Sequence, residues 1–202
     1  MLKKVEVVVF DFDGTLSSGD SNVAFGMYCF RHQLRPWLYL PWMGMALIAR
    51  IVNRSGSWWR ENMRRFLTPA MVKKFGPDFI RQHRRNRFGW AKDQVAAERA
   101  AGRMVILVSA GPNYLIPSLV RDIKFDAVIC SQMDPVRPWK YKFLCWGTNK
   151  VAAFDAWARE NKYIPHVVRS YSDSKSDMPM MNIADDQVWV DRKTGMRVAA
   201  GK

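Results

Sequence analysis

Long apolar runs and paired cysteines are both scarce in this sequence. No stretch reaches the roughly 18–20 uninterrupted apolar residues of a membrane-spanning helix. The nearest candidate, residues 36–49, is broken by Pro41 and closed by Arg50. The cysteines are few, odd in number and set among apolar neighbours (Cys29, Cys130 and Cys145), which favours reduced core thiols of a cytosolic protein over a disulfide framework. Residues 1–10 run straight into an apolar strand, so no signal peptide is expected.

Acidic residues are also under-represented. The chain has 32 Lys and Arg against 18 Asp and Glu, a net charge of +14, and this excess favours anionic partners: a phosphorylated substrate, a membrane surface or nucleic acid. With 202 residues, of which 49% are hydrophobic, the chain is large enough for one α/β domain with a smaller insertion.

The chain is organised around residues 5–16, where a β-branched apolar run ends in two carboxylates. Such a run is typical of a strand buried on both faces in a parallel sheet. Asp11 and Asp13 are two residues apart, so they share a face, and Gly14 permits the tight turn that follows. Ligands of open α/β sheets bind beyond the carboxyl ends of the strands. Two acids that point into one crevice repel each other, and a bound cation would resolve that repulsion.

Apolar strands alternate with helical segments along the rest of the chain. Further buried strands are expected at 104–108, 125–130, 166–171 and 187–190, with a short hairpin over 140–145 and a helix over 114–121. Residues 20–85 contain helical patterns without a strand, with a break at 76–78 and a long helix from 79 to 99. This order predicts an α/β fold with a doubly wound parallel sheet, a catalytic core formed by 1–19 and 86–202, and a helical cap formed by 20–85.

Chemically useful side chains recur at the predicted strand ends. Ser109 follows the second strand, Lys150 begins an amphipathic helix, and Asp173 and Asp177 follow the fourth strand. A phosphate monoester is dianionic, so an attacking carboxylate needs its repulsion removed, which Mg²⁺ held by carboxylates together with one lysine can do. The Ser109 hydroxyl and the amides of Ala110 and Gly111, at a helix entry, can hold the other phosphate oxygens.

These motifs, in this order, resemble the haloacid dehalogenase superfamily of phosphohydrolases. The helical insertion after the first motif resembles the branch that contains phosphoserine phosphatase (subfamily IB). Within the superfamily the chain is most similar to the bacterial phosphatidylglycerophosphatase C type. The segments that carry the resemblance are Asp11-x-Asp13-x-Thr15, Ser109, Cys145-x-Gly147-x-x-Lys150, Tyr171-Ser172-Asp173-Ser174, Asp177-x-Pro179 and the arginine-bounded apolar segment.

The resemblance implies a role for each matched residue. It makes Asp11 the nucleophile that forms an aspartyl-phosphate, and Asp13 the acid that protonates the leaving oxygen and then activates water. It places Mg²⁺ between the Asp11 carboxylate, the Asp13 backbone carbonyl and Asp173, with Asp177 orienting a bound water or Lys150. Asp20 stands where the related branch has a substrate-facing acid, and it fits a helix cap equally well.

The insertion carries most of the excess charge. Residues 20–100 hold fifteen Lys and Arg and five Asp and Glu, and the apolar segment 36–49 lies among tryptophans and arginines. This pattern is typical of an interfacial helix on an anionic membrane. The alternative is that the apolar residues pack inside the cap and the arginines form a solvated face.

The leading hypothesis is a Mg²⁺-dependent phosphomonoesterase that acts on a phospholipid headgroup phosphate such as phosphatidylglycerophosphate. Such an enzyme would be cytoplasmic and peripheral on the inner membrane. The alternatives are a phosphatase of a soluble molecule such as phosphoserine, a phosphotransferase that uses an acceptor alcohol, and a basic nucleic-acid-binding protein with a vestigial acidic site. No specific nucleic acid is expected, and the exact substrate and oligomeric state are left open.

Overall fold

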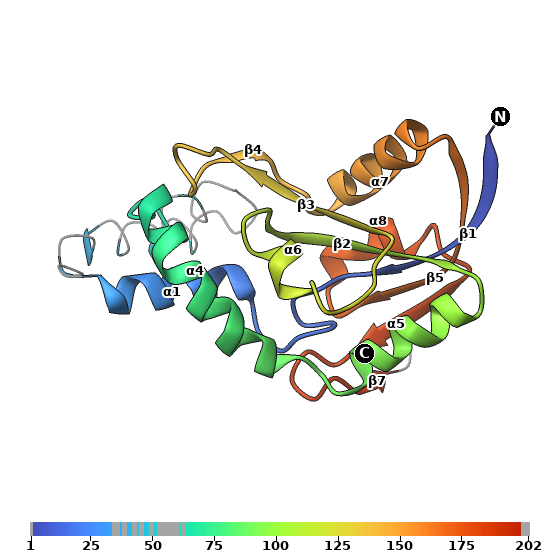
Figure 1. Ribbon diagram of the computed structural model, residues 1–202, viewed down its shortest axis with the longest axis horizontal. Helices are drawn as coiled ribbons and strands as arrows, with labels where there is room; N and C mark the ends of the chain where they lie inside the picture. Colours follow the sequence, from blue (N-terminus) through green and yellow to red (C-terminus); the bar gives the residue numbers. More distant parts are fainter. Residues whose placement is uncertain are drawn as a thin grey trace.

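A seven-stranded sheet forms the centre of the molecule in the computed structural model (Figure 1). The structure describes residues 2–33, 37, 40–41, 44, 47–48, 51, 61 and 64–198. The strands are β1 Lys3–Phe10, β2 Met104–Pro112, β3 Ala127–Met133, β4 Tyr141–Phe143, β5 Tyr163–Ser172, β6 Asp186–Val190 and β7 Arg197–Val198. Their order across the sheet is β4-β3-β2-β1-β5-β6-β7, and all neighbouring pairs are parallel except β3–β4 and β6–β7 at the two edges. The predicted α/β class with a mostly parallel sheet is confirmed.

Alternation along β1 divides its side chains between two apolar cores. Val7 and Val9 point to one face of the sheet and Val8 and Phe10 to the other, and all four are at most 1% exposed. The first face is covered by α7 Thr148–Glu160 and α8 Met178–Met181, and the second by α5 Trp90–Ala100 and α6 Ile116–Leu119 (Figure 1). Both faces of β1 are therefore buried, as its uninterrupted apolar run predicts.

Two further helices, α1 Ser21–His32 and α4 Pro69–His83, lie side by side at one end of the sheet (Figure 1). Aromatic rings hold them together: the Phe25 and Phe79 centroids are 5.1 Å apart, and those of Tyr28 and Phe79 are 5.7 Å apart. Both helices follow β1 and precede β2, where the sequence predicts a cap. The boundaries given for cap and core stay predictions.

The predicted helix break at 76–78 is wrong, because α4 runs continuously through Pro77. Pro77 is exposed, so the carbonyl that loses its amide partner can turn to water. The predicted long helix over 79–99 is also wrong. It is split by the 3-10 turn η2 Arg84–Asn86 and restarts at Trp90, since the Phe88 amide bonds instead to the carbonyl of Leu16.

Smaller differences from the predicted secondary structure concern short elements. The helix expected over 114–121 is confined to Ile116–Leu119, η3 Lys175–Asp177 precedes α8, and the two-residue β7 was not predicted. Pro36 and Pro41 also predict a kinked or broken helical pair over residues 37–51. This segment is described at only a few positions, so that prediction lies largely outside the described residues. Among the residues that are described, no helix is both long and apolar enough to cross a membrane.

Candidate active site

The end of β1 is held by a dense set of backbone hydrogen bonds. The Asp11 amide donates to the Tyr171 carbonyl on β5 (3.0 Å), and the Phe12 carbonyl accepts the amides of residues 15, 16 and 17. Gly14 adopts φ +84°, and a Cβ there would lie 2.3 Å from Oδ2 of Asp173. A side chain at position 14 is therefore excluded twice, by backbone strain and by the carboxylate above it.

Lys150 joins two of the predicted acidic residues. Its Nζ lies 2.7 Å from Asp11 Oδ1 and 2.7 Å from Asp177 Oδ2, and the ammonium is buried. Burial alone would lower the pKa of Lys150, but the two carboxylates outweigh it and raise that pKa. The lysine thus stays charged between two acids that are far apart in the sequence.

Asp11 is less acidic than an ordinary aspartate. Burial raises its pKa to about 7, because the effect of desolvation and of the nearby Asp177 and Asp173 exceeds the opposing effect of Lys150. Thr15 Oγ1 lies 3.5 Å from Asp11 Oδ2 and 3.3 Å from Asp173 Oδ1, so the two carboxylates flank one hydroxyl. The site carries more negative than positive charge and favours a cation.

Asp173 and Asp177 have different surroundings although both follow β5. Asp177 accepts hydrogen bonds from Lys150 and from Ser172 Oγ (2.8 Å), which turns it toward the lysine. The Asp173 side chain is 3% exposed and lies over Gly14; burial raises its pKa, opposed by Arg192 3.5 Å away. Only Asp173 of this pair directly faces the Asp11–Thr15 turn.

Asp13 is bound to the first residue of α1. Its Oδ1 accepts the Ser21 amide (2.8 Å) and its Oδ2 accepts the Ser21 hydroxyl (3.0 Å). Burial and repulsion from Asp20 raise the pKa of Asp13 well above its usual range. Asp20 itself caps α1, since its Oδ1 accepts the amides of Asn22 and Val23. The helix-cap interpretation of Asp20 is therefore confirmed, and its contact with substrate stays a prediction.

Ser109 lies at the carboxyl end of β2, beside β1. It is fully buried, and its Oγ accepts the amide of Gly111 (3.0 Å), while the Ala110 carbonyl accepts the Ser131 hydroxyl (2.8 Å). The expectation that Ala110 and Gly111 stand at a helix entry is wrong, because β2 continues to Pro112 and α6 begins only at Ile116. Phosphate binding by these three residues stays a prediction.

Several polar residues near this site were missed by sequence reasoning. Arg64, 5% exposed, donates to Asn22 Oδ1 (2.5 Å) and to Tyr141 Oη (2.8 Å), which links α1 to the β4 edge strand. Arg192 reaches Asp173 from the turn between β6 and β7. No motif marks either arginine, since both positions depend on contacts between distant segments.

The donor set suits a hard divalent cation. Within the described part of the chain, no group of three or more His, Cys, Asp or Glu side chains is arranged as a metal site. Mg²⁺, however, is bound by one or two carboxylates and keeps several waters. The Asp11 and Asp173 carboxylates, which flank Thr15 Oγ1, are such a pair of oxygen donors. The residues present therefore fit the ion, with Asp177 engaged by Lys150.

Comparison with known proteins gives three kinds of match. A family model described as haloacid dehalogenase-like hydrolase matches residues 8–182. A curated protein of Mycobacterium tuberculosis, described as a probable phosphatase, is 29% identical over 117 residues, which are 56% of this chain and 40% of that protein. The chain thus spans about two fifths of the length of the curated relatives it matches.

Solved structures share the fold over nearly the whole chain. A Bordetella pertussis protein described as of unknown function has a TM-score of 0.70 at 18% identity, over 93% of this chain and 91% of that one. A phospho-aspartyl intermediate analogue of phosphoserine phosphatase has a TM-score of 0.63 at 14% identity, covering 93% and 87%. Phosphoserine phosphatase in apo form has a TM-score of 0.65 at 13% identity, covering 91% and 84%. The predicted likeness to phosphoserine phosphatase is confirmed for the fold, and the closer resemblance to phosphatidylglycerophosphatase C stays a prediction.

Proposed function

The chain belongs to the haloacid dehalogenase-like hydrolases, and on that premise we propose that it is a Mg²⁺-dependent phosphomonoesterase that works through an aspartyl-phosphate on Asp11. The observation that carries the proposal is the buried Lys150 ammonium, 2.7 Å from both Asp11 and Asp177. It keeps a nucleophilic carboxylate in place and neutralises part of the charge that would repel a phosphate dianion. Phosphatases of this family generally use a divalent metal, typically Mg²⁺.

The proposed reaction proceeds through two successive displacements at phosphorus. In the first, an Asp11 oxygen forms a bond to phosphorus, the bond from phosphorus to the ester oxygen breaks, and Asp13 gives its proton to that oxygen. In the second, water attacks the aspartyl-phosphate, gives its proton to Asp13, and releases inorganic phosphate and free Asp11. A bound Mg²⁺ supplies charge neutralisation for the phosphate oxygens.

The raised pKa of Asp13 supports its acid role. A general acid must hold a proton near the working pH, and burial together with the neighbouring Asp20 raises the pKa of Asp13 well above its usual range. The hydrogen bonds from Ser21 fix both carboxyl oxygens and tie this acid to the start of α1. Any movement of α1 would therefore move the acid.

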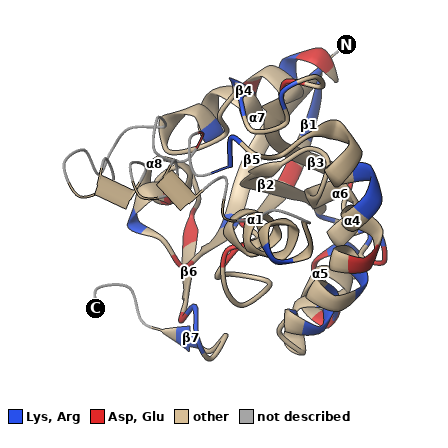
Figure 2. Cartoon of the chain, turned by 90° about the vertical axis from the view of Figure 1, so that its left-hand side faces the viewer, with Lys and Arg blue, Asp and Glu red and all other residues tan. Residues whose placement is uncertain are grey.

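We further propose a phospholipid substrate. Apolar side chains between α1 and α4 are exposed to solvent: Trp37 59%, Leu40 54%, Leu47 52%, Ile48 63% and Ile51 72%. Exposed aromatic and aliphatic side chains beside basic residues suit an anionic bilayer surface. The exposed Lys73 and Lys74 of α4 add positive charge. Figure 2 shows basic residues on α4, and each Lys or Arg near an anionic surface contributes about 1 kcal/mol.

A soluble phosphomonoester such as phosphoserine is the second candidate. Its support is the fold shared with phosphoserine phosphatase over more than nine tenths of the chain. Asp20, at the start of α1 and close enough to Asp13 to raise its pKa, would suit a substrate that carries an amine.

One assay tests both parts of the proposal. Purified protein with Mg²⁺ is given phosphatidylglycerophosphate in mixed micelles, lysophosphatidate, phosphoserine and an aryl phosphate, and inorganic phosphate release is measured. We expect turnover of the lipids to exceed that of phosphoserine, and chelation of Mg²⁺ or Asp11→Asn to abolish it. Asp155→Asn, an exposed acid on α7, is the matched control. Activity retained in Asp11→Asn would overturn the chemistry, and a preference for phosphoserine would overturn the lipid assignment.

A further inference from the structure

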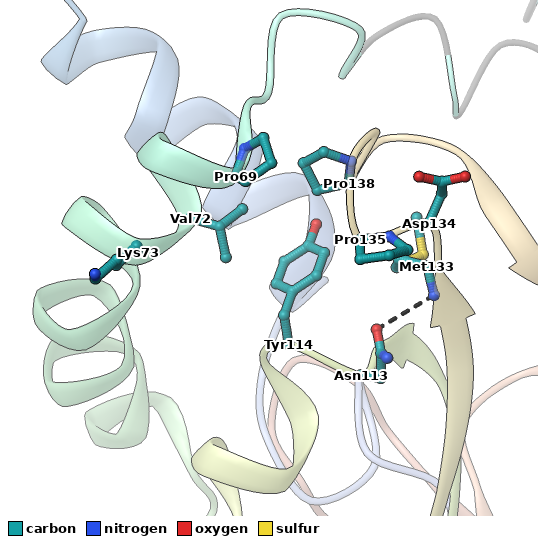
Figure 3. A pocket seen from close by; sticks show the side chains of 9 residues that line it. All are labelled: Pro69, Val72, Lys73, Asn113, Tyr114, Met133, Asp134, Pro135 and Pro138. Atoms are coloured by element: carbon teal, nitrogen blue, oxygen red, sulfur yellow. Dashed lines mark hydrogen bonds between the residues drawn. The ribbon is translucent and has the colours of Figure 1, made fainter.

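A pocket of about 300 Å³ lies where the first turns of α4 meet the end of β3 (Figure 3). This volume is at the lower end of the range usual for small-molecule sites. One wall comes from the first turns of α4, and the other from the loop after β2 and the turn after β3. Its apolar lining consists of Pro69, Val72, Tyr114, Met133, Pro135 and Pro138.

Asn113 and Asp134, at the rim of the pocket, are engaged elsewhere, whereas the buried Tyr114 hydroxyl has no hydrogen-bond partner among the described residues. Asn113 accepts the Met133 amide (3.2 Å) and donates to the side chain of Gln132 (3.0 Å). Asp134 accepts the amides of residues 136 and 137, both at 2.9 Å. The Lys73 ammonium points away from the other lining side chains (Figure 3). The lining is therefore mainly apolar, with one buried hydroxyl, and favours a ligand that is largely apolar.

Tyr114 forms the back of the pocket. Figure 3 shows its ring between the two walls, with the hydroxyl directed toward Pro69 and Pro138. Burial raises the pKa of this phenol to about 12, so it is neutral at physiological pH. A neutral ring offers an apolar face to a bound chain without adding a charge.

Prolines in both walls restrict the backbone around the pocket. Three of the lining residues are prolines, whose φ angles are fixed. The turn after β3 is closed by hydrogen bonds from the Asp134 amide to the Lys140 carbonyl (2.9 Å) and from the Lys140 amide to the Arg137 carbonyl (2.8 Å). A preformed pocket spares a ligand the cost of ordering its site.

A short loop joins the pocket to the end of β2 that carries Ser109, where the proposed function expects the substrate phosphate. Tyr114 follows Ser109 by five residues, so at most about 18 Å of chain separates them. Ser131 holds this loop against β3, since its carbonyl accepts the Asn113 amide (2.9 Å) and its hydroxyl donates to the Ala110 carbonyl (2.8 Å). A long alkyl chain on a phosphate beside Ser109, unlike a short one, can reach as far as this upper limit.

We propose that this pocket binds an acyl chain of a lipid phosphomonoester, an inference that rests on the proposed function and adds where the apolar part of the substrate lies. The occupant follows from the mainly apolar lining and from the short loop that joins the pocket to the end of β2, where the proposed function expects the phosphate of the same substrate at Ser109. Lys73, at the rim, suits the anionic surface from which the chain would enter.

The test is a series of straight-chain alkyl phosphates from two to fourteen carbons, below their micellar concentrations, with Mg²⁺ present. For the wild-type protein we expect kcat/KM to rise by up to about fourfold for each methylene that enters the pocket. Val72→Phe fills the pocket and should flatten this dependence. Ala70→Phe places the same ring at an exposed position of α4 and should keep it. If Val72→Phe does not fold, Pro135→Trp blocks the pocket from the opposite wall, where the side chain is exposed.

The outcomes separate the two proposals. Hydrolysis that is independent of chain length in the wild-type protein would overturn the pocket assignment and leave the phosphatase standing. A chain-length dependence that survives in both blocked variants would place the chain elsewhere and also overturn it. Failure to hydrolyse any alkyl or lipid phosphate would instead reject the proposed function itself.

Discussion

The guanidinium of Arg192 faces the carboxylate of Asp173 across 3.5 Å, although the arginine side chain is 60% exposed and the aspartate only 3%. A surface cation therefore lies at the edge of the buried acidic site, beside one of the two carboxylates that flank Thr15. The proposed Mg²⁺ would meet this positive charge.

Arg192→Gln is accordingly expected to tighten Mg²⁺ binding. The pair is exposed on one side and screened by water, so its contribution is at most about 1 kcal/mol, or about fivefold in Kd. Isothermal titration with Mg²⁺ measures this without any turnover. Lys193→Gln removes the same charge from the same turn and serves as control. Unchanged or weaker binding in Arg192→Gln would show that the arginine does not oppose the cation.

Lys150→Met should both inactivate and destabilise the protein. The substitution leaves Asp11 and Asp177 buried without their shared partner, and removal of one member of a buried ion pair typically costs about 3–5 kcal/mol. Urea unfolding measures the loss. Addition of Asp11→Asn to Lys150→Met should recover part of the stability but no activity, because one of the uncompensated charges is then gone. Full additivity of the two substitutions would contradict this coupling.

Glu98→Gln should lower the free energy of unfolding, by an amount that depends on pH. Glu98 is 2% exposed and binds Arg103, Arg169 (2.7 Å) and the Tyr171 hydroxyl (3.3 Å). Burial alone would raise the pKa of Glu98, but the hydrogen bonds from the two arginines lower it below its ordinary value of 4.5.

A carboxyl with a lowered folded-state pKa adds stability above its unfolded pKa and loses it as the pH falls through the folded pKa. The difference in unfolding free energy between wild type and Glu98→Gln should therefore be about 2–3 kcal/mol at pH 7 and shrink below about pH 4. Glu160→Gln, at an exposed end of α7, should show no such difference. A gap that stays constant from pH 7 to pH 3 would contradict the ionic role of Glu98.

The three cysteines should resist alkylation in the folded protein. All are buried and unpaired, and burial raises the pKa of Cys29 and Cys145 to about 12 and that of Cys130 to about 11. The reactive thiolate is therefore scarce at pH 8. Mass spectrometry after iodoacetamide treatment should find no label without denaturant and three labels in urea. Cys145→Ala should keep phosphatase activity, and loss of activity in a folded variant would give this thiol a chemical role.

Sequence alone determined the parts that depend on local pattern. The apolar run of β1, the spacing of Asp11 and Asp13, and the position of Asp20 before a helix each follow from periodicity, strand alternation and capping, which involve neighbours in the chain. The strands at the centre of the sheet were predicted for the same reason. The helix through Pro77 was not, because the tolerance of a proline depends on whether its turn faces water.

Tertiary structure decided which of these residues meet. Lys150 contacts Asp11 across 139 residues of sequence, and Arg192 reaches Asp173 from an edge hairpin that no pattern predicted. The β2 strand, by running to Pro112, removes the expected helix entry and leaves the Gly111 amide bound to Ser109. Such contacts depend on strand register and on how helices pack against the sheet, and burial then shifts the pKa values of the groups brought together. Short-range propensity carries no information about these contacts or about the pKa shifts. Both arise only when distant segments exclude water from the same space.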